Sequence, residues 1–174
     1  MTGDGGEVVL LLGGARSGKS RMAQARAEAT AQAALIYIAT GEARDAEMTD
    51  RIARHRADRG PRWQTFEVPI ELPEVIARER GAERVVLVDC LTLWLSNLLL
   101  SDRDISDATD RLLDSLKSGA GLVLLVSNEV GLGIVPDNAL ARRFRDEAGR
   151  LHQRVAAIAD EVLLVAAGLA IRMK

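Results

Sequence analysis

The segment Gly13-Gly14-Ala15-Arg16-Ser17-Gly18-Lys19-Ser20 directly follows an apolar run, Val8 to Leu12. Its G-x-x-x-x-G-K-S pattern is typical of a loop that joins a buried strand to a helix and holds a phosphate chain. Glycines let the backbone turn tightly and point successive N–H groups at an anion. Lys19 adds a positive charge, Ser20 offers a hydroxyl to Mg²⁺, and the helix that follows directs the positive end of its dipole at the phosphates. Residues 20–30 are rich in strong helix formers, so both flanks of the motif favour a nucleotide-binding loop.

The composition predicts one soluble domain. The chain has 174 residues, 48% of them hydrophobic, which is enough for one buried core. A net charge of −2 argues against a nucleic-acid partner or an anionic membrane surface. No apolar run approaches the roughly 18 residues that a membrane span needs, and the first residues do not look like a targeting segment. The single cysteine, Cys90, excludes an internal disulfide and fits the reducing cytoplasm, where we expect the protein to work.

Strand and helix patterns alternate along the chain. We expect residues 1–6 to form a flexible tail and residues 7–174 a single P-loop nucleotide-binding domain. Buried or edge strands are predicted at 7–12, 34–39, 63–68, 85–89, 122–127, 162–166 and 168–174. Helices are predicted at 20–32, 45–59, 69–80, 91–100, 104–118 and 139–160. This alternation favours an α/β fold with a mainly parallel sheet flanked by helices, whose strand order stays open.

The nearly all-apolar helix predicted at 91–100 has two interpretations. Such a helix is buried either in the core of its own domain or against another subunit. Core packing is the simpler interpretation, and a subunit contact is the alternative.

Three candidate site segments lie where predicted strands end. An apolar strand that ends in Asp89 is typical of P-loop enzymes that hold Mg²⁺ next to the loop hydroxyl, here Ser20. The turn Ala39-Thr40-Gly41 lies where ligands bind in open α/β sheets, although an ordinary turn explains it equally well. Asn128 and Glu129 begin a glycine-rich loop, and they either contact substrate or metal or lead to a helix cap at Asn138.

These features indicate a Mg²⁺-dependent nucleotide enzyme or switch. A small-molecule kinase fits the phosphate loop, and a guanine-nucleotide switch is disfavoured because the chain has no N-K-x-D segment. A nucleotidyltransferase that carries the nucleotide on a histidine is the third alternative, with His55 as the candidate. The arginines around His55 would stabilise a phosphate, but the residues alone favour a solvated helix face.

Several segments taken together resemble a known family. They are the phosphate loop, Tyr37-Ile38-Ala39-Thr40, Arg51-Ile52 with His55, Arg59 and Trp63 after it, Asp89-Cys90-Leu91-Thr92, Asn128-Glu129-Val130-Gly131 and Phe144-Arg145-Asp146. This combination resembles the bifunctional adenosylcobinamide kinase/adenosylcobinamide-phosphate guanylyltransferase of cobalamin biosynthesis. The resemblance spans nearly the whole chain after the tail.

The resemblance implies a RecA-like P-loop fold, a homotrimer and two reactions in one catalytic domain. The first phosphorylates adenosylcobinamide with ATP or GTP. The second transfers GMP from GTP to adenosylcobinamide phosphate through a histidine intermediate, giving adenosylcobinamide-GDP and pyrophosphate. His55 and Lys19 would be catalytic, and Ser20 and Asp89 would hold Mg²⁺.

The resemblance also implies which residues bind the nucleotide. They are Gly13, Gly14, Ala15, Arg16, Ser17, Gly18, Lys19, Ser20, Ala39, Thr40, Gly41, Arg56, Ala57, Asp58, Arg59, Glu67 and Asp89. The chain departs from some relatives in two places. Arg54 stands where they have a second histidine, and Asp89 stands where they have Glu.

Overall fold

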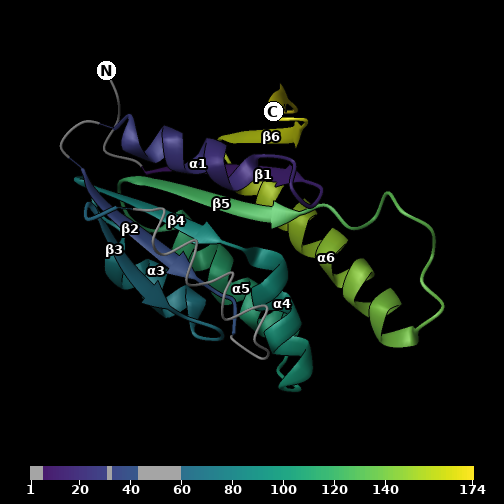
Figure 1. Ribbon diagram of the computed structural model, residues 1–174. Coiled ribbons are helices and arrows are strands. Elements are labelled where there is room, and N and C mark those ends of the chain that lie inside the picture. Colours follow the sequence, from purple (N-terminus) through teal and green to yellow (C-terminus); the bar gives the residue numbers. More distant parts are fainter. Residues whose placement is uncertain (1–5, 31–32, 43–59) are drawn as a thin grey trace.

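A seven-stranded sheet forms the centre of the computed structural model, which describes residues 6–30, 33–42 and 60–174 (Figure 1). The strands are β1 (Glu7–Gly13), β2 (Ala34–Ala39), β3 (Trp63–Glu67), β4 (Arg84–Asp89), β5 (Leu122–Asn128), β6 (Glu161–Ala166) and β7 (Leu169–Arg172). Their order is β3-β2-β4-β5-β1-β6-β7, and only the β6–β7 pair is antiparallel. The expected α/β fold with a mainly parallel sheet is confirmed, and residue 168 onward does form an edge strand.

The described helices cover both faces of the sheet, one helix on one face and four on the other. They are α1 (Lys19–Glu28), α3 (Leu72–Glu79), α4 (Leu91–Leu100), α5 (Ile105–Lys117) and α6 (Ala139–Ile158). Alternate residues of β1 explain its unbroken apolar run. Val9 and Leu11 pack on the α1 side with Ala23 and Ala27, whereas Leu10 packs on the side of α3 to α6. A central parallel strand that is buried on both faces has no reason to alternate with polar residues.

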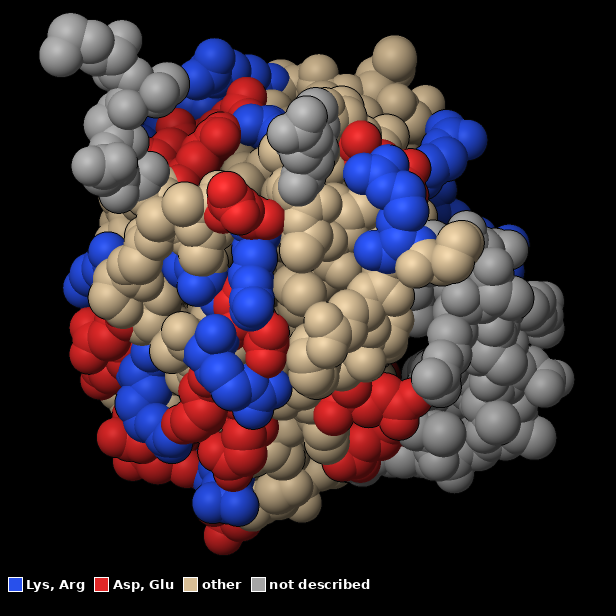
Figure 2. Space-filling model, turned by 90° about the vertical axis from the view of Figure 1, so that its left-hand side faces the viewer, with Lys and Arg blue, Asp and Glu red and all other residues tan. Residues whose placement is uncertain are grey.

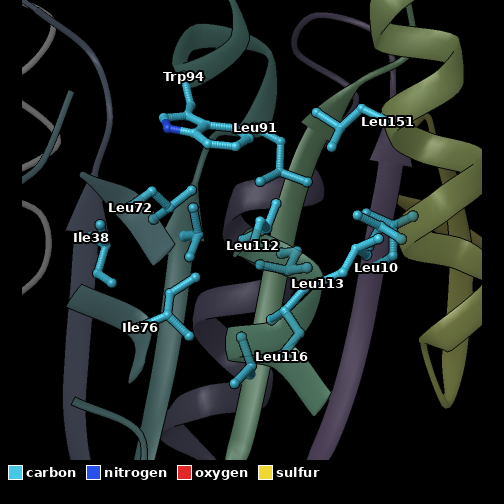
Figure 3. Close-up of a cluster of buried hydrophobic side chains, with 14 of the residues drawn as sticks. Leu10, Ile38, Leu72, Ile76, Leu91, Trp94, Leu112, Leu113, Leu116 and Leu151 are labelled. Carbon is cyan, nitrogen blue, oxygen red and sulfur yellow. The ribbon is translucent and has the colours of Figure 1, made fainter. Parts of the chain in front are cut away.

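The larger core lies between the sheet and helices α3 to α6, and Figure 3 shows Leu10, Leu91, Trp94 and Leu112 as members of this one cluster. Trp94 is fully buried, and its indole N–H donates a hydrogen bond of 2.7 Å to the Ile70 carbonyl. Only the last residue of α4, Leu100, is an exposed large hydrophobic. Core packing is therefore what makes α4 apolar, and a subunit contact through it stays a prediction.

Two boundaries of the described helices differ from the expectation by more than two residues. α3 begins at Leu72 rather than at residue 69, because Pro69 and Ile70 turn their carbonyls to the side chains of Asn97 and Trp94. α1 ends at Glu28 rather than near residue 32, and the Thr30 N–H closes its end on the Ala27 carbonyl at 3.1 Å. The predicted cap of α6 is confirmed, since the Asn138 side chain accepts from the backbone N–H groups of residues 140 and 141.

Charged side chains of both signs are mixed on the side that lies at the left of Figure 1 (Figure 2). Arg26 forms ion pairs with Glu7 and Glu161, and Arg84 pairs with Glu79. The described residues of this face therefore form no continuous basic surface for a nucleic-acid backbone. None of the described helices has the length and hydropathy that crossing a membrane would require.

Candidate nucleotide-binding site

The phosphate-loop motif, Gly13 to Ser20, spans the turn from the end of β1 to the start of α1, and its backbone needs glycine at two positions. A Cβ on Gly13 would lie 2.4 Å from the Val165 carbonyl oxygen and 2.6 Å from Ser17 Oγ. Gly18 has φ 98°, in the left-handed region that L side chains avoid, and directly precedes α1. The motif glycines thus allow β1 to turn into α1 within a few residues.

Neighbouring strands brace this loop. The Glu129 N–H donates to the Gly13 carbonyl at 3.0 Å, and the Gly168 N–H donates to the Ser17 carbonyl at 2.8 Å. Gly168 belongs to a two-residue hairpin turn between β6 and β7, in which Ala167 and Gly168 have φ of 52° and 77°. Positive φ at both residues is the signature of the tight turn that suits a twisted hairpin. The loop is therefore held by the ends of both neighbouring strands.

Lys19 lies at the junction of the loop with α1. Its side chain is only 7% exposed, and Nζ donates a hydrogen bond of 3.0 Å to the Gly14 carbonyl. The next residue, Ser20, is half-buried in the first helical turn. Because the N–H groups of that turn have no helical partners, loop, ammonium and helix start all favour an anion here.

Asp89 is the last residue of β4, and a buried tyrosine holds its carboxylate in place. The Tyr37 hydroxyl donates 2.9 Å to Asp89 Oδ2, and the Tyr37 ring is 3% exposed and stands edge-on to Trp63. The peptide bond from Asp89 to Cys90 is cis. Burial raises the pKa of the Cys90 thiol and Asp89 raises it further, whereas the hydrogen bond with Thr92 opposes the shift.

The strand register brings Asp89 and the phosphate loop to the same end of the sheet, where the parallel strands finish. Asp89 follows Val85 and Leu87 on the α1 face of β4, and Asn128 follows Leu124 and Val126 on the same face of β5. β5 lies between β4 and β1, and Asn128 pairs in register with Gly13. The end of β5 therefore stands between the predicted metal ligand and the phosphate loop, a position that the sequence alone does not reveal.

Thr40 follows β2, and its hydrogen bonds link the end of that strand to Cys90, which follows β4. It is fully buried, and its hydroxyl both accepts from the Cys90 N–H at 2.9 Å and donates to the Cys90 carbonyl at 2.7 Å. Its carbonyl accepts from the Asn97 amide at 2.7 Å. These contacts give Thr40 a structural role. Nucleotide binding by Ala39, Thr40 and Gly41 stays a prediction.

Of the other residues that are predicted to bind the nucleotide, the structure describes only some. Glu67 is exposed at the end of β3, in register with Ala39 at the same edge of the sheet. His55, Arg56, Ala57, Asp58 and Arg59 lie outside the described residues. Their part in the site stays a prediction.

His152 supports the end of β5 from the opposite face. It is 9% exposed on α6, and its Nε2 lies 2.7 Å from the hydroxyl of the fully buried Ser127. Burial lowers the pKa of His152, and the Glu129 carboxylate opposes that shift. This buried contact gives His152 a structural role.

Comparison with known proteins identifies the family. The model of the family described as "Cobinamide kinase / cobinamide phosphate guanyltransferase" matches residues 9–173. This chain belongs to that family. Its relatives include the bifunctional adenosylcobalamin biosynthesis protein CobP of Pseudomonas aeruginosa, 49% identical over 167 residues that cover 95% of this chain and 96% of the relative. The bifunctional adenosylcobalamin biosynthesis protein CobU of Salmonella typhimurium is 40% identical over 182 residues, covering 96% and 99%.

Solved structures agree on the fold of this cobinamide kinase / cobinamide phosphate guanyltransferase family member. The flagellar accessory protein FlaH of Methanocaldococcus jannaschii aligns with a TM-score of 0.51 at 12% identity, covering 98% of this chain and 79% of FlaH. A second solved structure, an ATPase domain, aligns with a TM-score of 0.50 at 15% identity, covering 91% of this chain and 68% of that domain. At such identities the likeness concerns the fold alone, and the expected RecA-like P-loop NTPase fold is confirmed.

The two adjacent loop glycines provide a matched test of the loop geometry. Replacing Gly13 by Ala forces a Cβ against a backbone oxygen, so we expect the free energy of unfolding to fall by about 1–3 kcal/mol. Gly14→Ala meets nothing within 4 Å and lies on the surface, so a change within about 0.5 kcal/mol is expected. Urea denaturation without nucleotide measures both. Equal losses in the two variants would contradict this geometry.

Burial of His152 predicts a pH dependence of stability. The pKa of His152 is lower in the native state than its ordinary value of 6.5. As the pH falls below 6.5, the unfolded chain therefore binds the proton before the native state does. The free energy of unfolding should then decrease by up to about 1.4 kcal/mol per pH unit, until the native state also binds the proton. Urea denaturation between about pH 7.5 and 5.5 should show a steeper decrease for the wild type than for His152→Gln. Parallel pH curves would rule out this linkage.

Proposed function

We propose that this chain catalyses two successive transfers to a corrinoid, phosphorylating adenosylcobinamide with ATP or GTP and then transferring GMP from GTP to adenosylcobinamide phosphate. The observation that carries the proposal is the braced phosphate loop with buried Lys19, at the same sheet edge as Asp89, in a chain that matches the family over residues 9–173. The two curated relatives are named as bifunctional proteins of adenosylcobalamin biosynthesis, which supports both reactions.

In the first reaction, the corrinoid hydroxyl oxygen bonds to the γ-phosphorus while the bond from that phosphorus to the bridging oxygen breaks. The hydroxyl proton is released, and a nucleoside diphosphate leaves. Negative charge on the phosphate oxygens must be neutralised throughout. Lys19 and the N–H groups at the start of α1 would do this, and the hydrogen bonds from the neighbouring strand ends, which hold the loop in place, support that role.

The donor groups present suit Mg²⁺. Among residues 6–30, 33–42 and 60–174, no three His, Cys, Asp or Glu side chains gather into a metal cluster. Mg²⁺ commonly needs less, because one or two protein oxygens combine with phosphates and water. The Ser20 hydroxyl and the Asp89 carboxylate would hold it, with Tyr37 orienting that carboxylate. When bound, Mg²⁺ supplies positive charge to the phosphate oxygens.

In the second reaction, an imidazole nitrogen of His55 bonds to the α-phosphorus of GTP, and pyrophosphate leaves. A phosphate oxygen of adenosylcobinamide phosphate then bonds to the same phosphorus, which releases His55 and gives adenosylcobinamide-GDP. Nucleophilic catalysis divides one difficult transfer into two steps. Arg56 to Arg59 and Glu67 would bind the guanine nucleotide beside the phosphate loop.

The proposal also covers the compartment, the domain organisation and the assembly of the enzyme. We infer a cytoplasmic enzyme with one catalytic domain over residues 7–174, a tail at residues 1–6, and a homotrimeric assembly. The family resemblance supports the trimer, and the single buried cysteine suits a reducing compartment.

Replacing Lys19 tests the phosphate loop. Lys19→Ala removes the buried ammonium that faces the phosphates, so both reactions should slow at least about tenfold. Steady-state assays with labelled ATP and GTP measure each reaction separately. Lys117→Ala, on the surface of α5, is the matched control and should keep both rates. An unchanged kinase rate in Lys19→Ala would show that the loop does not hold the transferred phosphate.

Labelling with GTP tests the histidine intermediate. GTP that carries its label at the α-phosphate should leave acid-labile, alkali-stable label on the wild type, as a phosphoramidate does. His55→Ala should lose that label. His152→Gln should keep it, since His152 is buried against Ser127. Label that survives in His55→Ala would refute the assignment, and absence of label from the wild type would favour a kinase alone.

A further inference from the structure

We propose that Asn128 is a catalytic residue of the phosphoryl-transfer reaction, and that Thr92 is the residue that positions it. The Asn128 side-chain amide would donate a hydrogen bond to an oxygen of the transferred phosphoryl group. This inference rests on the proposed kinase activity, and it concerns a residue for which sequence analysis left two interpretations open.

Asn128 stands at a central position among the strand ends. It is the last residue of β5, the strand between β1 and β4, and it stands opposite Gly13 where the phosphate loop begins. Asp89 ends the neighbouring strand on its other side, opposite Val126. A group at this position therefore lies between the two parts that would hold the phosphates and their metal, and it is half-buried rather than enclosed.

Thr92 orients the side-chain amide of Asn128. Thr92 is 4% exposed in the first turn of α4, and its Oγ1 lies 3.3 Å from the Asn128 backbone nitrogen and 3.2 Å from Asn128 Nδ2. One hydroxyl oxygen thus accepts from both the main chain and the side chain of the same residue. The second N–H of Asn128 Nδ2 is not needed for this contact, so it is the donor that we assign to the phosphoryl oxygen.

Both chain neighbours of Asn128 are also held by hydrogen bonds. Ser127 is fixed by His152 on the opposite face of the sheet, and Glu129 by its N–H bond to the Gly13 carbonyl. Two backbone N–H groups of the following loop also bond to the Glu129 carboxylate, at 2.7 Å and 3.1 Å. A donor held in place before the reaction stabilises developing charge without the cost of reorganisation.

Replacing Asn128 tests the donor directly. Asn128→Ala should lower the kcat of adenosylcobinamide phosphorylation by about 10²-fold, the effect of losing one preorganised donor. The Kd of a non-hydrolysable ATP analogue, measured by titration calorimetry, should change less than about threefold, because the loop and Lys19 remain. Asn128→Asp has nearly the same shape but places a carboxylate where the donor stood, so it should be at least as slow as Asn128→Ala.

Thr92 variants separate positioning from folding. Thr92→Val keeps the shape and removes the acceptor, so kcat should fall at least about tenfold while the Kd of the ATP analogue is kept. Thr92→Ser restores the hydroxyl and should restore kcat. Urea denaturation identifies any variant that merely unfolds.

The outcomes are distinct. A wild type without kinase activity overturns the proposed function and this inference together. With an active wild type, a kcat of Asn128→Ala or Asn128→Asp within about threefold of normal overturns this inference alone. The same holds if Thr92→Ser fails to rescue, or if kcat and analogue binding fall in parallel.

Discussion

The pairing of β1 with β5 on one side and β6 on the other is the constraint on which the rest of the structure depends. It satisfies the backbone of β1 on both edges, while apolar residues bury both of its faces. The phosphate loop therefore leaves the sheet at a fixed point, with one strand end on each side. β5 supplies Asn128 and Glu129, and the turn after β6 supplies Gly168.

Buried polar contacts then shape the edge where the strands end. Thr40 with Cys90, Tyr37 with Asp89, Thr92 with Asn128, and Ser127 with His152 each join two segments far apart in the sequence. The net contribution of such a bond to stability is only about 1 kcal/mol, but leaving one buried partner unsatisfied costs more. These pairs therefore specify one arrangement of the strand ends more than they strengthen the fold.

Sequence reasoning succeeded where a residue's environment follows from its local pattern. Unbroken apolar runs predicted β1, β2, β4 and β5 to within one or two residues, and the glycine–lysine motif predicted the turn from β1 to α1. It did not give the strand order, because an apolar run records burial and not which strand lies beside it. The Tyr37 support of Asp89 was missed for a similar reason. A hydroxyl and a carboxylate that lie 52 positions apart leave no periodic signal. The start of α3 was also missed. The side chains of Trp94 and Asn97, which belong to another helix, bond to the backbone carbonyls just before α3 and keep these residues out of the helix.

The hydrogen bond from Gly168 to Ser17 joins two segments that are far apart in the sequence. Ribosomes make a chain from its amino end, so the motif emerges before the hairpin turn that braces it. A nascent chain that stops before β6 and β7 carries every residue of the motif and lacks one of the two strands beside β1. The phosphate loop thus gains this brace only after β6 and β7 have joined the sheet.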